Sequence, residues 1–198
     1  MDGAGSGVDA WTLQGNSSRR TSGENIIATS LTGEPAPLSL DFVFESASLL
    51  GRYNWGLAGG EASIQAYVDH QFANVGTYGK GTVNTADLDF QHRLVPYGVH
   101  EIMWGLGGRM LQTEIAAASS VLSITPPRRQ SRVFSAFVQD EITLVPQTWK
   151  LTVGGRFEYS SRSRFEPQPT ARLMWTPNME DSVWASWSRA ARTPSIEI

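Results

Sequence analysis

Side-chain alternation with a period of two residues is the feature that most constrains this chain. In the segment WKLTVGGRFEY, residues 149–159, Trp149 and Tyr159 share one face with apolar side chains, whereas Lys150 and Arg156 fall on the opposite face. No sustained apolar recurrence with helical spacing is present, and Gly or Pro interrupts most windows long enough to hold a helix. The sequence therefore predicts an all-β chain of antiparallel strands.

The same alternation recurs along the chain, clearly in EASIQAYVD, ADLDFQHRL, HEIMWGLGGRM and ARLMWT. In VFSAFVQDEITL the rings of Phe134 and Phe137 fall on opposite faces, so we expect a β-bulge in this strand. About nine strands are predicted in total. They cover approximately residues 8–18, 47–57, 61–72, 84–95, 98–112, 131–145, 148–160, 168–177 and 181–190.

Short and long connections are expected to alternate between these strands. Gly, Pro, Asn and Asp favour tight turns at 58–60, 95–98, 145–148 and 177–181. Longer and more polar connections are expected at roughly 19–46, 73–83, 113–130 and 161–167. Outer-membrane barrels have this asymmetry, with tight turns on one side and extended loops on the other. No linker is visible, so we expect residues 1–198 to be part of one barrel domain.

Composition excludes several classes of protein. The chain has no Cys, which rules out disulfide scaffolds and thiolate metal sites. Its 16 basic and 19 acidic side chains are scattered without a basic block, so nucleic acid is not an expected partner. No apolar run approaches the roughly 18 to 20 residues of a membrane-spanning helix. The first residues lack a signal peptide, so export would require an N-terminus further upstream.

Alternation alone also fits a soluble β-sandwich, but the spacing of the aromatic residues favours a membrane. Trp149 and Tyr159 are ten residues apart on one face. At about 3.3 Å per residue and a tilt near 40°, this separation projects to roughly 25 Å, the height of the apolar band between the aromatic girdles of an outer-membrane barrel. Together with the alternating connections, the spacing predicts an antiparallel transmembrane β-barrel, here only a part of a larger one.

Several segments also resemble a known family. FVQDEITL, VPQTWKLTVGGRFEYSS, FEPQPTARLMWTP and SVWASWSRAARTPSIE follow one another as similar motifs do in the middle of the barrel of TonB-dependent outer-membrane receptors. This resemblance is strongest over residues 131–198. Upstream, DAWTLQGN, GRYNWGL, ASIQAYVDHQF, DLDFQHRL and EIMWGLGGRM look like the preceding strands of the same family.

The resemblance implies a barrel of about 22 strands around an N-terminal plug domain. Such receptors import scarce ligands such as ferric siderophores, cobalamin, haem or oligosaccharides, driven by the TonB complex of the inner membrane. We therefore expect a fragment of a bacterial outer-membrane receptor that lacks the plug domain and the C-terminal strands. Its expected partners are outer-membrane lipid, the plug, the TonB complex, and a ferric siderophore or similar ligand. The alternatives are a passive porin-like barrel and a soluble β-sheet binding domain.

Catalytic and metal-binding patterns are weak. His70, His92 and His100 fall in different strands without the spacing of metal ligands. The adjacent Asp140 and Glu141 point to opposite faces of a strand and cannot share a substrate. We expect neither an enzyme nor a cofactor or metal site.

Charged residues in external loops are the better candidates for function, because binding surfaces accumulate in loops on a rigid scaffold. Arg128 and Arg129, with Arg162 and Arg164 in the next connection, are the predicted contacts for an anionic ligand. The alternative interpretation is a solvated, arginine-rich loop that faces lipopolysaccharide phosphates.

Overall fold

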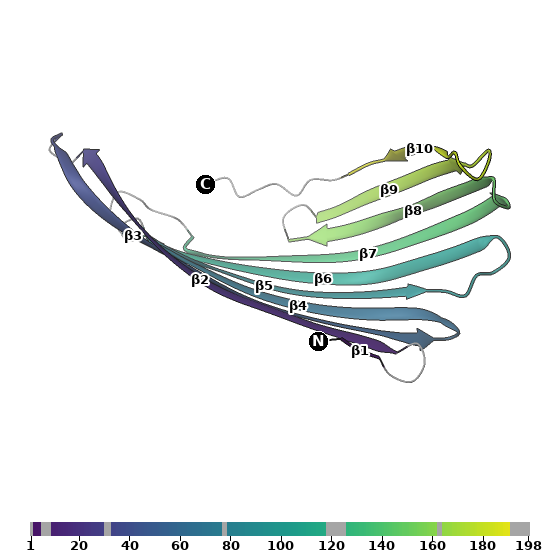
Figure 1. Ribbon diagram of the computed structural model, residues 1–198, viewed down its shortest axis with the longest axis horizontal. Helices are drawn as coiled ribbons and strands as arrows, with labels where there is room; N and C mark the ends of the chain where they lie inside the picture. The colour runs from purple at the N-terminus through teal and green to yellow at the C-terminus, as the bar shows by residue number, and fades with distance from the viewer. Residues whose placement is uncertain are drawn as a thin grey trace.

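The computed structural model describes residues 2–4, 9–29, 33–76, 79–117, 126–161 and 164–190. They form one antiparallel sheet in which each strand pairs with its neighbours in sequence, in the order β1 to β10 (Figure 1). The strands are β1 (Asp2–Ala4), β2 (Ala10–Thr29), β3 (Pro35–Leu57), β4 (Gly60–Val75), β5 (Gly79–Arg93), β6 (His100–Ala117), β7 (Arg128–Val145), β8 (Trp149–Ser160), β9 (Arg164–Trp175) and β10 (Val183–Ser188). The predicted all-β, antiparallel class is confirmed. The nine expected strands correspond to β2–β10, and β1 is additional.

The prediction of a long connection at 19–46 is wrong. Strands β2 and β3 pair without interruption from Ala10 opposite Asn54 to Thr29 opposite Pro35, and this ribbon extends past the other strands (Figure 1). Most side chains of β2 are exposed whichever face they occupy. Polar residues therefore occur on both faces, and the alternation that identifies a strand in the sequence is lost.

Strict alternation of short and long connections is also wrong. At the ribbon end of the sheet, β4 ends at Val75 and β5 begins at Gly79, and β8 ends at Ser160 and β9 begins at Arg164. Only the interval between β6 and β7 at this end is long, from residue 117 to residue 128. Extended strand replaces most of the loop that was expected, because backbone pairing continues into segments with polar residues on both faces.

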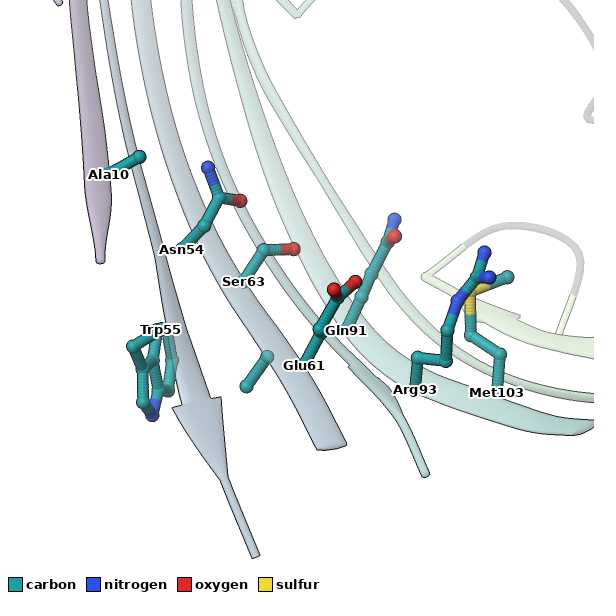
Figure 2. Close-up of a pocket in the computed structure, with 9 residues that line it drawn as sticks. Ala10, Asn54, Trp55, Glu61, Ser63, Gln91, Arg93 and Met103 are labelled. Atoms are coloured by element: carbon teal, nitrogen blue, oxygen red, sulfur yellow. The ribbon is translucent and has the colours of Figure 1, made fainter. Parts of the chain in front are cut away.

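The two faces of the sheet differ in chemistry. Figure 2 shows the strands as an arc, with Asn54, Ser63 and Gln91 pointing into its concave side and Trp55 pointing away. We call the concave side the inner face and the convex side the outer face. Residues that pair across strands share a face, so the register assigns every strand residue to one of them. Exposed apolar side chains on the outer face include Leu49, Ile64, Leu88, Leu106, Phe134, Phe157 and Leu173.

The sheet is a single layer without a conventional core. Among the described residues, Leu40 and Ala62 are the only buried hydrophobic side chains. The chain exposes 14196 Å², whereas a compact monomer of 21.7 kDa would expose about 9,200 Å². No second sheet in the described ranges covers the apolar outer face, so the soluble sandwich is not supported.

Aromatic residues form two belts on the outer face. Trp55 on β3 is in register, through paired residues, with Gly155 on β8, and Trp149 lies six residues before Gly155. Six residues are about 20 Å along a strand, and five strand spacings are about 24 Å across the sheet. The line from Trp55 to Trp149 is therefore inclined by about 40° to the direction perpendicular to the strands. Phe72 on β4 and Phe165 on β9 have the same offset at the ribbon end. Both belts are therefore level in a membrane if the strands tilt by about 40°, as in outer-membrane barrels.

Ring contacts strengthen both belts. The end of the sheet opposite the ribbon carries the turns from Leu57 to Gly60 and from Val145 to Trp149, here called the short turns. In the belt nearer these turns, Tyr53 stacks on Trp55 with ring centroids 5.4 Å apart, and Trp149 stacks on Trp175 at 5.6 Å. In the other belt, Phe157 stacks on Phe165 at 6.0 Å. Each pair joins neighbouring positions of the apolar surface and leaves that surface facing outward.

A register shift is present in the strand where a β-bulge was expected, but it lies at the end of that strand and not between Phe134 and Phe137. Pairing between β6 and β7 is continuous from Arg128 to Ile142, and the register of β7 against β8 shifts only between Thr143 and Val145. Phe137 therefore lies on the inner face, over Gly105. A Cβ at Gly105 would collide with the Phe137 ring and would lie 2.5 Å from the Phe90 carbonyl oxygen. Glycine makes room for an inward aromatic ring, and no bulge is needed to turn it outward.

Candidate functional site

The inner face is the candidate functional surface because it carries most of the strand charges. Alternation places these charges opposite the apolar face of the same strands. Those on the five adjacent strands β4 to β8 include Glu61, Asp87, Asp89, Arg93, Glu101, Arg109, Glu141, Lys150, Arg156 and Glu158.

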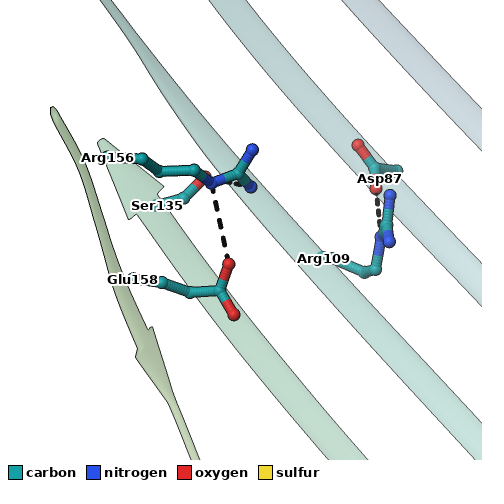
Figure 3. Close-up of polar contacts among 5 residues, drawn as sticks. All are labelled: Asp87, Arg109, Ser135, Arg156 and Glu158. Carbon is teal, nitrogen blue, oxygen red and sulfur yellow. Dashed lines mark hydrogen bonds and ion pairs between the residues drawn. The ribbon is translucent and has the colours of Figure 1, made fainter. Parts of the chain in front are cut away.

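A cluster of these groups lies in the middle of the sheet (Figure 3). Arg109 on β6 is the Cα partner of Asp87 on β5, and its Nε donates to the Asp87 carboxylate. The Asp87 side chain is only 9% exposed, whereas the Arg109 side chain is 63% exposed, so the carboxylate is covered and the guanidinium reaches the surface. Arg156 on β8 donates from Nη2 to Ser135 Oγ at 3.2 Å, and its Nε lies 3.6 Å from Glu158 Oε2.

Gly107 has no side chain, and this leaves room for the central cluster to pack. A Cβ at Gly107 would lie 2.7 Å from Asp89 Oδ1 and 2.7 Å from Ser135 Oγ. The two oxygens therefore occupy the space of a side chain between β5 and β7. The result is a tightly packed polar surface of both signs that suits contact with another polar protein surface or with water.

Further polar contacts extend the inner face toward the short turns. Lys150 Nζ lies 2.5 Å from Glu141 Oε1. Farther along the sheet, the Arg172 guanidinium lies 5.1 Å from the ring centroid of Trp184, in a cation–π contact. At the other edge, Figure 2 shows a shallow hollow whose lining includes Asn54, Glu61, Ser63, Gln91 and Arg93. Polar contacts thus occur across the whole width of the inner face.

The four arginines predicted as ligand contacts lie in different surroundings. Arg128 and Arg129 begin β7 instead of ending the preceding loop, and as consecutive strand residues they face opposite sides. Arg128 lies on the outer face with its Nη2 2.9 Å from Glu114 Oε1, whereas Arg129 pairs with Thr113 on the inner face. Arg164 is the first residue of β9, and Arg162 lies outside the described residues. The loop placement is therefore wrong for Arg128, Arg129 and Arg164, and ligand contact stays a prediction.

The three histidines make three separate contacts. His70 Nδ1 lies 2.7 Å from Asn84 Oδ1, His92 Nε2 lies 3.1 Å from the Leu57 carbonyl oxygen, and His100 Nδ1 lies 2.6 Å from Asp140 Oδ2. No group of three or more acidic or histidine side chains in the described part of the chain is arranged to hold a metal ion.

The neighbouring carboxylates Asp140 and Glu141 point to opposite faces, as the alternation predicts. Asp140 contacts His100 on the outer face, and Glu141 contacts Lys150 on the inner face. The pairing of His100 with Asp140 is absent from the sequence-based expectations, because 40 positions separate the two residues and only the strand register brings them together.

Within the described ranges there is no helix long and apolar enough to cross a membrane.

Comparison with protein families matches residues 4–197 to the family described as TonB dependent receptor-like, beta-barrel. The chain belongs to this family. The resemblance seen in the strand motifs is thereby confirmed and extends upstream to nearly the whole chain. TonB-dependent receptors are a family of transport receptors. A search of curated proteins returned no match.

Solved structures with a similar fold are siderophore receptors of low sequence identity. The siderophore receptor PirA from Pseudomonas aeruginosa has a TM-score of 0.65 at 16% identity, covering 98% of this chain and 39% of that protein. A variant of the ferric enterobactin receptor PfeA from Pseudomonas aeruginosa has a TM-score of 0.65 at 18% identity, covering 94% and 31%. PirA from Acinetobacter baumannii has a TM-score of 0.64 at 9% identity, covering 94% and 34%. The chain thus has the fold of part of such a barrel and spans between 31% and 39% of these receptors.

Proposed function

We propose that this chain forms part of the barrel wall of a bacterial outer-membrane TonB-dependent receptor that imports a scarce ligand such as a ferric siderophore. The family match over residues 4–197 carries the proposal. The siderophore receptors among the similar structures support the ligand class, although identities of 9% to 18% bear on the fold alone. The passive porin-like alternative draws no support from these comparisons.

The outer face supports a place in the outer membrane, with lipid as its partner. Its two aromatic belts are level at a strand tilt of about 40°, and most side chains between them are apolar. We propose that the ribbon end lies on the extracellular side and the short turns lie in the periplasm. Substitution by cysteine tests this orientation: in intact cells Ser163→Cys should react with an impermeant maleimide and Asn178→Cys should not. The reverse pattern would invert the topology.

The inner face supports contact with a plug domain of the same receptor. The central cluster around Arg109 and Arg156 presents both charge signs on one rigid surface, and charge complementarity favours a specific orientation of a docked partner. The plug, in turn, would connect the barrel to the TonB complex. Neither partner is part of the described residues.

For ligand contact we propose Arg129, with Arg162 and Arg164 in the neighbouring connection. Arg129 lies on the inner face at the ribbon end, where an anionic chelate would enter the barrel. Arg128 is left out of the proposed ligand contacts, because it faces outward and pairs with Glu114.

Transport measurements on the full-length protein test the function. Cells that depend on this receptor should take up a labelled ferric siderophore at low external concentration, and uptake should stop when the inner-membrane proton gradient is collapsed. Uptake that persists without the gradient would indicate a passive pore and would contradict the proposal. Arg129→Gln should weaken ligand binding, whereas Arg52→Gln, on the inner face near the short turns, provides a charge-matched control.

A further inference from the structure

Strand β9 contains two prolines, Pro167 and Pro169, although it lies between β8 and β10 in the sheet. Proline has no backbone N–H, so in sheets it is normally confined to edge strands, strand ends and bulges. The pairing of β9 with β8 runs from Arg164 to Trp175 without a bulge. The two prolines therefore remove hydrogen-bond donors from a continuous strand of the wall.

The missing donors all point toward β10. Arg189 N donates to the Pro169 carbonyl oxygen at 3.1 Å, and Thr176, which follows β9, donates to the carbonyl oxygen of Thr148, which precedes β8, at 2.8 Å. The N–H and C=O of one strand residue point to the same side, and successive residues alternate. Odd-numbered residues of β9 thus bond toward β10 and even-numbered residues bond toward β8. Both prolines are odd-numbered, so the ladder with β8 keeps its donors.

The junction of β9 with residues 183–190, here called the β9–β10 seam, weakens at the prolines. Cα pairing runs from Trp175 opposite Val183 to Thr170 opposite Ser188 and stops one residue before Pro169. There a single hydrogen bond from Arg189 replaces the two that such a pair would exchange, because Pro169 cannot donate. The next position that bonds toward this side is Pro167, which cannot donate either. The seam is therefore closed near the short turns and weak toward the ribbon end.

The weak part of the seam lies at membrane depth. Phe165 belongs to the belt at the ribbon end, and Pro167 and Pro169 follow it by two and four residues. At about 3.3 Å per residue and a tilt of 40°, the prolines lie roughly 5 and 10 Å inside this belt. Backbone groups without partners are costly in hydrocarbon, so water from the inner face is the remaining source of hydrogen bonds.

A hollow on the inner face brings water to the seam. It measures about 380 Å³, and its lining includes Gln139, Arg156, Gln168, Thr170, Arg189 and Ala190. Most of these side chains are polar, and several water molecules of about 30 Å³ each would fit. Opposite Pro169, Gly155 of β8 has no side chain, so the wall is also thin at this point.

We propose that the β9–β10 seam is a hydrated weak point that opens reversibly in its half toward the ribbon end. Opening separates Arg189 and the residues after it from β9, while the pairing from Thr170 to Trp175 holds. It breaks few hydrogen bonds because two donors are absent, and the released carbonyl groups bind water in the hollow. The wall can thereby yield when a plug rearranges inside the barrel during transport. The inference rests on the barrel function proposed above and adds a moving part to it.

Hydrogen exchange of the full-length receptor, folded in detergent micelles and followed by mass spectrometry, tests the opening. Peptides around Arg189 should exchange about tenfold or more faster than peptides from residues 136–140 of β7, which is paired on both sides. Pro167→Ala/Pro169→Ala restores both donors and should remove most of this difference. Pro177→Ala, in the turn after β9, is the matched control and should leave it unchanged. Equal exchange around Arg189 in the wild type and the double variant would overturn the proposal.

A disulfide across the seam tests whether transport uses the opening. Gln168 and Ala190 both line the hollow and are the next inner-face positions beyond the last described pair. Oxidation of Gln168→Cys/Ala190→Cys should abolish ligand uptake, leave ligand binding unchanged, and be reversed by a reductant. Asn54→Cys/Ser63→Cys joins two Cα partners on the inner face of β3 and β4 and should transport normally when oxidised.

Normal uptake with the seam disulfide formed would overturn the proposal, because the wall would then work without opening. Wild-type uptake measured beside these variants separates this result from a failure of the proposed function. A wild type that imports no chelate contradicts that function, whereas normal wild-type uptake with no response to the seam variants contradicts this inference alone.

Discussion

Leu106→Arg tests whether the outer face of the sheet meets hydrocarbon. Leu106 lies on β6 between its partners Phe90 and Ala136, and it is 54% exposed. The two inclined aromatic belts cross β6 at about equal distances on either side of this residue, roughly 14 Å along the normal from each. Leu106 is therefore at the level of the bilayer midplane if the belts mark the interfaces.

The expected magnitude separates the two environments. An arginine at the midplane of an outer-membrane barrel costs about 2 to 4 kcal/mol relative to alanine. That cost is a factor of roughly 30 to 1,000 in the unfolding equilibrium. At an exposed strand position in water the same substitution would change stability by about 0.5 kcal/mol or less. The expected cost of Leu106→Arg in a membrane thus differs from its cost in water by more than the error of a denaturant titration.

The measurement compares arginine with alanine at two sites in the full-length barrel refolded into lipid vesicles. Trp149 lies in the belt near the short turns, where an arginine should cost only about 0 to 1 kcal/mol relative to alanine. Using Trp149→Ala as the reference removes the loss of its stack on Trp175 from the comparison. Val153 is a poor choice for the midplane site, because its partner Asp140 on the same face would pair with an introduced arginine.

Unfolding by urea, followed by tryptophan fluorescence and by gel mobility, gives the free energies. If Leu106→Arg costs no more than Leu106→Ala, or if the arginine penalty is the same at both sites, then the outer face does not meet a bilayer.

Three further predictions concern packing and exposure. Gly107→Ala should destabilise the barrel by about 1 to 3 kcal/mol, because the added Cβ overpacks the central cluster. Gly51→Ala is the control and should be nearly neutral, since nothing lies within 4 Å of the new Cβ. Equal effects of the two substitutions in the same titration would refute the crowding at Gly107. His100→Leu should cost about 1 to 3 kcal/mol because it leaves the Asp140 carboxylate without its partner, and the double variant with Asp140→Leu should recover most of that loss; a double variant no more stable than the single one would contradict this. The chain in isolation should need detergent, since its open edges and outer face are uncovered, and a monodisperse soluble monomer in light scattering would show otherwise.

In the strands with clear alternation, the face of a residue could be predicted from the sequence because alternation is a local property. Leu106 and Trp149 lie on the outer face as expected, and Arg156 lies on the inner face. The register, in contrast, depends on turns and on pairing between distant segments. The ion pair of Arg109 with Asp87 joins residues 22 positions apart, and no local pattern identifies it.

The ribbon of β2 and β3 shows where alternation stops being informative. Ser18 on the inner face and Arg19 on the outer face are both exposed, and their partners Ser46 and Glu45 are also polar. A segment with water on both sides needs no apolar face, so its strands are specified by backbone pairing and leave little trace in the sequence. The prediction of a long loop at 19–46 failed for this physical reason.

Steric crowding at glycine positions indicates the curvature of the sheet independently of the aromatic belts. In the middle of the strands, a Cβ on the inner face would lie 2.7 Å from Asp89 Oδ1 at Gly107 and 2.6 Å from the Val138 carbonyl oxygen at Gly154. At Gly108 and Gly155, the neighbouring glycines on the outer face, nothing lies closer than 3.8 Å and 3.7 Å. A concave face brings side chains together and a convex face separates them, so crowding at alternate glycines indicates which side is the interior. Of the two adjacent glycines in GLGGR, the crowded one shares its face with Arg109, and alternation therefore identifies it once the charged face is known to be concave.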